Sequence, residues 1–92
     1  MSEARVKFYT PLKEKIGQSD MMVVGYGGKE VLDNLRAELG PVRAQELFGE
    51  DGQIKRQYLL VHNERTVGIE EFKRSTIQKG DTVRFVLPIA GG

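Results

Sequence analysis

The sequence predicts an α+β domain in which one main helix packs on a mixed sheet of about four to five strands. Three observations lead to this fold class: strand patterns near both ends of the chain, one helical period between them, and a length that suits one core. A chain of 92 residues buries roughly 60 to 65% of its unfolded surface, which is too little to divide between two cores. We therefore expect residues 1–92 to form a single domain.

The first half of the chain predicts a hairpin. Residues 5–9 alternate between polar and apolar side chains, which places Val6 and Phe8 on one face of a strand and Lys7 on the other. Residues 21–24 are apolar throughout, so periodicity does not assign the side that faces the core. A second strand paired with the first is the simplest interpretation.

A helical period begins at Lys29. It produces an apolar stripe while the intervening positions stay polar, which is typical of an amphipathic helix. The helix is expected to stop at Gly40 and Pro41, because glycine suits the left-handed cap position and proline cannot continue the hydrogen-bond ladder. The stripe consists of Val31, Leu32, Leu35 and Leu39.

A short helical turn is expected to follow at residues 42–48, with Val42, Leu47 and Phe48 directed inward. The glycines and acidic residues at 49–52 are expected to end this turn.

The second half of the chain is rich in β-branched and aromatic residues. A strand is predicted over residues 54–63, followed by a turn at 63–66 and a short return strand at 66–67. Residues 69–78 are expected to be irregular. A tight turn at 79–81 leads to a final strand over 82–87, whose core face is expected to carry Val83, Phe85 and Leu87.

Composition excludes several classes of function. Fourteen basic and thirteen acidic residues leave a formal net charge of +1, and the charges are interspersed, so no nucleic-acid partner is expected. Without cysteine there is no disulfide, thiolate nucleophile or thiolate metal site. The apolar runs are strand-sized and no signal-peptide pattern is present, which indicates a cytoplasmic protein with no membrane partner.

Side chains that often carry chemistry are isolated here. His62 is the only histidine, so it makes no catalytic triad or metal site, and it is expected to be structural or solvent-exposed. Residues 25–28 are glycine-rich but lack the Gly-Lys-Ser/Thr of a phosphate loop, which favours a flexible turn. The acidic pairs at 50–51 and 70–71 are expected on solvated loops.

Three segments together resemble a known family. Residues 6–9 followed by 12–17 are similar to the opening of MoaD proteins, and residues 61–64 to their central strand and turn. Residues 79–92 resemble the ending of the MoaD/ThiS sulfur carriers and the related archaeal ubiquitin-like small modifier proteins: a Gly-Asp turn, a last strand, a proline, a small residue and Gly-Gly. The likeness covers nearly the whole chain and leans to the MoaD branch, although one proline stands where the family often has an aromatic-Pro-Pro sequence.

The resemblance implies a β-grasp (ubiquitin-like) fold and a carrier rather than an enzyme. A ubiquitin-activating-type adenylyltransferase, similar to MoeB or ThiF, would transfer AMP from ATP to the carboxylate of Gly92. Sulfur from a persulfide, or a lysine amine, would then displace AMP. No cofactor is expected to bind the carrier itself; the further partner would be a MoaE-like molybdopterin synthase large subunit or a lysine of a target protein.

The tail at residues 89–92 is expected to be flexible and to reach roughly 13 Å into a partner's cleft. Because ordering the tail costs on the order of 1 to 2 kcal/mol per residue, the domain must supply a docking surface. The last strand is the candidate, with Tyr58 and Leu60 nearby, although Leu60 and Val86 are equally well interpreted as ordinary half-buried sheet residues. The expected partner-binding residues are Arg84, Val86, Pro88, Ile89, Ala90 and Gly91.

Three functions remain open from the sequence. The chain is a sulfur carrier for molybdopterin-type cofactor synthesis, a modifier joined to lysines through Gly92, or an interaction domain whose tail is dispensable. If modifiers form polymers, seven lysines are acceptors that the sequence does not distinguish: Lys7, Lys13, Lys15, Lys29, Lys55, Lys73 and Lys79.

Overall fold

The computed structural model describes residues 2–88, so the tail predicted at 89–92 lies outside the described residues. A five-stranded sheet has the order β2-β1-β5-β3-β4. β1 and β5 run parallel and the other neighbouring pairs run antiparallel, which confirms the predicted mixed sheet. The elements are β1 (Glu3–Phe8), α1 (Leu12–Ile16), β2 (Asp20–Val24), α2 (Gly28–Ala44), β3 (Leu59–His62), β4 (Arg65–Val67), α3 (Ile69–Lys73) and β5 (Thr82–Val86).

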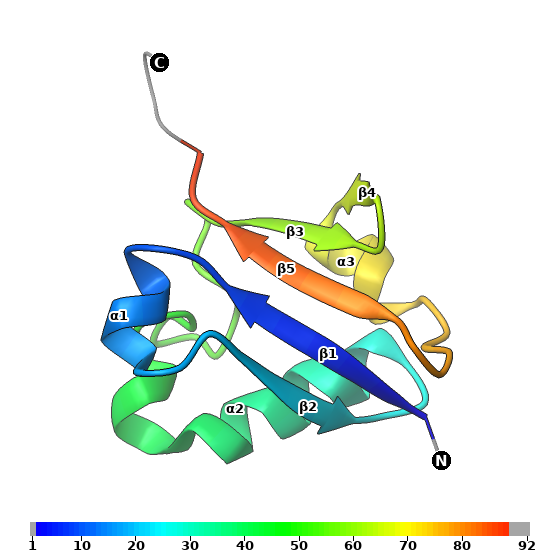
Figure 1. The fold of residues 1–92 in the computed structure, drawn as a ribbon, viewed down its shortest axis with the longest axis horizontal. Coiled ribbons are helices and arrows are strands. Elements are labelled where there is room, and N and C mark those ends of the chain that lie inside the picture. The colour runs from blue at the N-terminus through cyan, green and yellow to red at the C-terminus, as the bar shows by residue number, and fades with distance from the viewer. Residues whose placement is uncertain (1, 89–92) are drawn as a thin grey trace.

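The helices pack against one face of the sheet, and within residues 2–88 no helix covers the other face (Figure 1). None of the helices in this described part is long and apolar enough to cross a lipid bilayer. We call the face without helices the outer face.

The predicted hairpin of β1 and β2 is confirmed. Val6 and Phe8 point into the core, as their alternation predicts, and Ala4 joins them. On β2, Val23 is fully buried while Met22 and Val24 are exposed, which assigns the inward side that the apolar run concealed.

The main helix, α2, buries the predicted stripe at Val31, Leu32, Leu35 and Leu39 against the sheet. The regular helix is interrupted at Gly40, where the sequence predicts its end. Gly40 has φ 79° and ψ 168°, and a second helical segment follows directly from Pro41 to Ala44 across a kink. Glycine supplies the positive φ, and Pro41 lacks the N–H that an unbroken helix requires, so the predicted break is confirmed.

The segment after the kink confirms two of three predicted core residues. Leu47 and Phe48 are buried, but Val42 is 78% exposed. Within the helical residues 41–44, the buried residue is Ala44. Since residues two apart on a helix do not share a face, a buried Ala44 turns Val42 to solvent.

The strand predicted over residues 54–63 is wrong in its first half. Only Leu59–His62 forms β3, and Ile54 makes an isolated bridge with Phe48. The intervening backbone turns, with the Tyr58 amide donating to the Lys55 carbonyl at 3.2 Å. Ile54 and Tyr58 are nevertheless buried, so their apolar character correctly indicated core positions without determining the backbone conformation.

Two short helices are absent from the sequence prediction. α1 and α3 each contain five residues, too few to show a helical period. α3 replaces the first half of the irregular segment predicted at 69–78 and buries Phe72, while residues 74–78 belong to no helix and no named strand, as predicted. The return strand predicted at 66–67 is confirmed as β4. At the end of β5, Val83 and Phe85 are core residues, but Leu87 lies beyond the strand and is 36% exposed.

The glycine-rich segment before α2 is a site of close packing, so the expectation of a flexible turn is wrong. The Gly28 amide donates to the carbonyl of Ser75 at 2.9 Å. A Cβ built on Gly28 would lie 1.8 Å from the Phe72 carbonyl oxygen. A Cβ on Gly25 would lie 2.7 Å from a methyl group of Val31. Glycine is therefore required at residue 28, where the start of α2 packs against the C-terminal end of α3.

Replacing Gly28 with alanine is expected to destabilise the domain by at least about 2 kcal/mol, because the methyl group must displace backbone rather than a flexible side chain. Urea denaturation measures the effect. Gly68→Ala is the matched control: its Cβ meets nothing within 4 Å. That variant should lose no more than about 1 kcal/mol. Equal midpoints for the two variants would contradict the packing described.

Candidate functional site

The candidate site is the outer face around the C-terminal half of β5. The parallel register places Lys7 of β1 beside Arg84, and the antiparallel register of β3 places Val61 beside Arg84 and Leu59 beside Val86. The neighbours of these residues along each strand, such as Leu60 and Phe85, are buried in the core, so alternation directs the five side chains outward. We call Lys7, Leu59, Val61, Arg84 and Val86 the β5 patch.

The β5 patch combines apolar surface with two cations. Leu59 is 43% exposed, and Val61 and Val86 are half-buried. Arg84 donates through Nη1 to the carbonyl of Asn63 at 3.4 Å. Its buried Nε has no hydrogen-bond partner in the described part of the chain. Such a surface is complementary to a partner that offers apolar contacts bordered by carboxylates.

The structure brings together some of the residues predicted for docking and not others. Arg84 and Val86 lie side by side on the outer face of β5, and Pro88 is exposed shortly after them. Tyr58 and Leu60 are only 8% and 1% exposed, so their predicted place near the docking surface is wrong.

The remaining site residues divide into two groups. Ile89, Ala90, Gly91 and Gly92 lie outside the described residues. The structure adds Lys7, Leu59 and Val61 to the candidate surface. The sequence does not single out Leu59 and Val61, because an unbroken apolar run at 58–61 conceals which parity faces outward. The pairing of β3 with β5 supplies the missing information.

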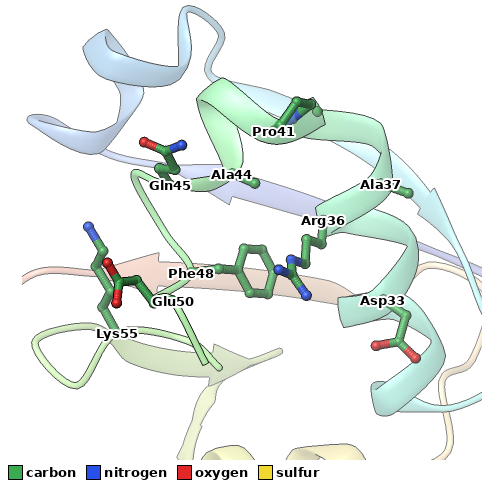
Figure 2. Close-up of a pocket in the computed structure, with 11 residues that line it drawn as sticks. Asp33, Arg36, Ala37, Pro41, Ala44, Gln45, Phe48, Glu50 and Lys55 are labelled. Atoms are coloured by element: carbon green, nitrogen blue, oxygen red, sulfur yellow. The ribbon is translucent and has the colours of Figure 1, made fainter. Parts of the chain in front are cut away.

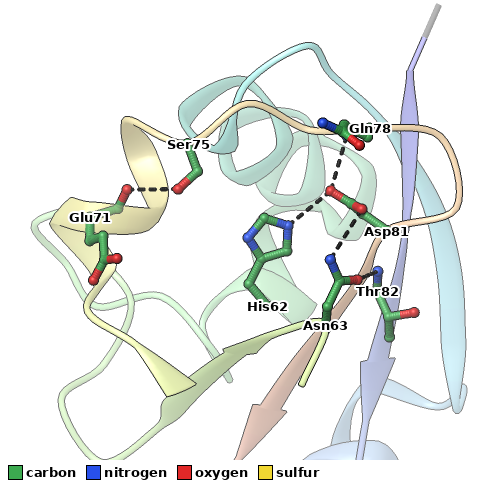
Figure 3. Close-up of polar contacts among 7 residues, drawn as sticks. All are labelled: His62, Asn63, Glu71, Ser75, Gln78, Asp81 and Thr82. Atoms are coloured by element: carbon green, nitrogen blue, oxygen red, sulfur yellow. Dashed lines mark hydrogen bonds and ion pairs between the residues drawn. The ribbon is translucent and has the colours of Figure 1, made fainter. Parts of the chain in front are cut away.

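A polar cluster fixes the opposite end of β5 (Figure 3). His62 Nε2 lies 2.9 Å from Asp81 Oδ2, and Asn63 Nδ2 donates to Asp81 Oδ1 at 3.2 Å. The backbone amide of Gln78 donates to Asp81 Oδ2 at 3.0 Å, and that of Thr82 donates to Asn63 Oδ1 at 3.0 Å. These contacts join the end of β3 to the turn that begins β5.

His62 is structural, in agreement with one of the two roles expected for it. Its side chain is 14% exposed, and its ring meets Phe72 edge-on with centroids 5.3 Å apart. Burial by itself raises the pKa of Asp81, but hydrogen bonds from Gln78, His62 and Asn63 outweigh it. The pKa of Asp81 is therefore lowered from its ordinary value of 3.8.

The acidic pair at 70–71 lies on α3 rather than on a loop. Glu70 pairs with Lys73 at 3.2 Å and Glu71 with Arg65 at 3.6 Å, and both carboxylates are more than half exposed. Surface ion pairs of this kind contribute little to stability. Among residues 2–88, no group of three or more histidines or carboxylates is arranged to hold a metal ion.

An open groove lies between α2 and residues 48–55 (Figure 2). Its volume is about 1000 Å³. The Arg36 guanidinium lies 6.0 Å from the centroid of the Phe48 ring, and Asp33 is paired with Lys29 at 2.9 Å. The lining carries both signs of charge and belongs to the exposed side of α2, so the groove is separate from the β5 patch. The lining residues are Asp33, Arg36, Ala37, Gly40, Pro41, Ala44, Gln45, Phe48, Gly49, Glu50 and Lys55.

Solved structures share this arrangement of one main helix on a mixed sheet. Small archaeal modifier protein 1 (SAMP1) from Methanosarcina acetivorans superposes with a TM-score of 0.78 at 20% identity, covering 100% of this chain and 98% of that one. SAMP1 from Haloferax volcanii has a TM-score of 0.77 at 21% identity, covering 99% of this chain and 100% of that one. The chain has the ubiquitin-like β-grasp fold.

Two further neighbours carry other names. CysO in the BexX/CysO complex from Amycolatopsis orientalis matches with a TM-score of 0.73 at 19% identity, covering 97% of this chain and 99% of that one. A putative molybdopterin converting factor subunit 1 from Pyrococcus furiosus has a TM-score of 0.61 at 20% identity, covering 97% of this chain and 100% of that one. No protein-family model and no curated protein sequence matches the chain. The resemblance to the MoaD/ThiS group is thus confirmed by β-grasp neighbours, at the level of fold.

The lowered pKa of Asp81 predicts acid sensitivity. Because the folded pKa lies below the unfolded one, this carboxylate stabilises the fold fully above about pH 4, and the contribution is lost as pH falls through the folded pKa. Asp81→Asn should therefore be less stable than the wild type near neutral pH, and the difference should shrink in acid. Urea titrations at a series of pH values measure it. A difference that stays constant down to pH values well below 4 would show that Asp81 does not act through its charge.

Proposed function

We propose that the chain is a cytoplasmic ubiquitin-like carrier whose Gly92 carboxylate is adenylated by a partner enzyme and converted to a thiocarboxylate for sulfur transfer. One observation carries this proposal. The last strand, which leads to the Gly-Gly ending, presents an open apolar and cationic patch next to Leu87 and Pro88. A partner that binds the β5 patch is therefore also placed to receive the chain that follows Pro88.

The chemistry requires activation because a terminal carboxylate, with a pKa near 3.5, is an anion that resists nucleophiles. A Gly92 oxygen would attack the α-phosphate of ATP on a ubiquitin-activating-type adenylyltransferase and release pyrophosphate. The terminal sulfur of a persulfide would then attack the Gly92 carbonyl and release AMP. A thiol would cleave the resulting acyl disulfide, which leaves the thiocarboxylate on Gly92 and a disulfide on the donor. The carrier supplies the reacting carboxylate and no catalytic side chain.

The β5 patch supports the docking step. Ordering four tail residues costs on the order of 1 to 2 kcal/mol each, which the folded domain must offset. Leu59 and Val86 provide apolar contact, while Lys7 and Arg84 provide charge that selects an acidic partner surface. CysO, one of the structural neighbours, occurs in a complex with BexX, so a member of this fold group does engage a second protein.

For the partner that uses the thiocarboxylate, we propose a MoaE-like molybdopterin synthase large subunit, on which the sulfur would pass to a molybdopterin precursor. Support comes from the MoaD-like sequence motifs and from the neighbour described as a putative molybdopterin converting factor subunit 1. Conjugation of Gly92 to lysines is the second candidate function, and it is favoured by the neighbours described as small archaeal modifier protein 1. Both functions use the same adenylated Gly92.

Adding one residue after Gly92 tests the shared first step. The extension should leave the urea midpoint unchanged, because it lies beyond the described core, and should abolish adenylate formation by the partner enzyme. Intact mass after incubation with ATP, adenylyltransferase and sulfur donor should show replacement of one oxygen by sulfur in the wild type alone. An extended protein that still gains sulfur would contradict the mechanism. Branched lysine peptides carrying Gly92 would instead identify the modifier.

Charge and apolar variants of the outer face test docking. Arg84→Glu should lower kcat/KM for ATP–pyrophosphate exchange by about tenfold or more, since reversing one interfacial charge costs on the order of 1 to 3 kcal/mol. Arg5→Glu is the matched control on the same face, where Arg5 is already paired with Asp20 at 3.2 Å. Leu59→Ala is compared with Met22→Ala, because the two side chains are 43% and 40% exposed. Equal losses within each pair would remove the β5 patch as the docking surface.

A further inference from the structure

The free edge of β2 is a second surface of interest, because a strand of another chain can pair with it. Among the strands of residues 2–88, β2 is the last in the sheet and pairs with β1 on one side only. The Phe8 amide donates to the Ser19 carbonyl at 2.8 Å and the Gly25 amide to the Ser2 carbonyl at 3.0 Å. In an antiparallel ladder these contacts alternate, so the amides and carbonyls of Asp20, Met22 and Val24 point to the free edge.

The side chains on this edge favour association. Met22 and Val24 are 40% and 38% exposed on the outer face, and Tyr26 just beyond the strand is 62% exposed. An edge strand with exposed apolar side chains and no proline is a template for pairing with another chain. A second β2 would extend the sheet antiparallel about Met22, pairing Asp20 of each copy with Val24 of the other.

Two side-chain amides already occupy the carbonyls that such pairing needs. Gln18 Nε2 donates to the Asp20 carbonyl at 2.9 Å, and Asn34 Nδ2 donates to the Val24 carbonyl at 2.8 Å. Gln18 belongs to the loop before β2 and Asn34 to α2. With both carbonyls capped, a second β2 keeps only the hydrogen bonds between the two Met22 residues.

The cap from Gln18 is held in place by the kinked end of α2. Arg43 donates through Nη1 to Gln18 Oε1 at 2.9 Å, and through Nε to the Leu39 carbonyl at 3.0 Å. Because a guanidinium only donates, Gln18 must present its oxygen to Arg43 and its NH₂ group to Asp20. The break at Gly40 thus has a second consequence: it brings Arg43 to a position from which it orients the cap.

We propose that Gln18 and Asn34 keep the protein monomeric by capping the free edge of β2 against a second copy of the chain. The partner is a second copy of the chain. Two β2 strands that pair antiparallel about Met22 are self-complementary, because each offers the other the same donors, acceptors and apolar side chains. The proposal concerns the edge opposite β4 and does not depend on the chemistry of Gly92.

The test compares the wild type with Gln18→Ala/Asn34→Ala, using Gln45→Ala as a control that removes an exposed amide from the groove between α2 and residues 48–55. Sedimentation velocity over a range of concentrations should give a monomer for the wild type and control, and a mass that doubles for the double variant. Hydrogen exchange at Asp20, Met22 and Val24 should slow with concentration, by about tenfold at saturation, in the double variant alone.

Three outcomes would overturn the proposal: a double variant that stays monomeric, a dimer that leaves the β2 amides unprotected, or a wild type that already pairs through β2. If circular dichroism shows that the double variant does not fold, sedimentation velocity and hydrogen exchange are measured on Asn34→Ala alone, and they decide the proposal. Asn34 is exposed on α2, where alanine favours the helix, so this variant should fold. It should self-associate more weakly with the same pattern of protection, and a monomer at every concentration would refute the claim.

Discussion

The parallel pairing of β1 with β5 is the constraint on which the rest of the molecule depends. β1–β2 and β3–β4 are hairpins formed by neighbours in sequence, but β1 and β5 join the two ends of the chain. Closing so long a loop is entropically unfavourable until apolar burial offsets it. The pairing of Val6 with Val83 and of Phe8 with Phe85, all buried, supplies that burial at the centre of the sheet. Without it, neither the β5 patch nor the position of Leu87 and Pro88 after the strand would be defined.

Much of this architecture follows from periodicity in the sequence. Alternation at residues 5–9 and the stripe on α2 correctly predict which side chains form the core, since both patterns are long enough to show their period. The predicted class, an α+β domain with one main helix on a mixed sheet, is confirmed. So is the turn at Gly80, which has φ 91° and therefore needs glycine.

Other features depend on contacts between distant residues. α1 and α3 have only five residues each, and the parity of β3 is concealed by an unbroken apolar run. Gly28 reads as a flexible residue in sequence, yet its lack of a Cβ is required by the Phe72 carbonyl. For the site, the sequence predicts Arg84 and Val86 but misplaces Tyr58 and Leu60, because only the register of β3 with β5 separates the inner from the outer residues.

The adjacency of Lys7 and Arg84 has a consequence for the energetics of the free protein. Like charges at paired positions repel one another, so the unbound protein holds a local electrostatic cost beside its last strand. A partner carboxylate placed between the two cations would convert that repulsion into attraction. Added salt acts on the two states in opposite directions, because screening relieves the repulsion in the free molecule and weakens the attraction in the complex. For the docking proposed above, rising ionic strength therefore favours the free protein over the complex and slows the encounter between the two partners.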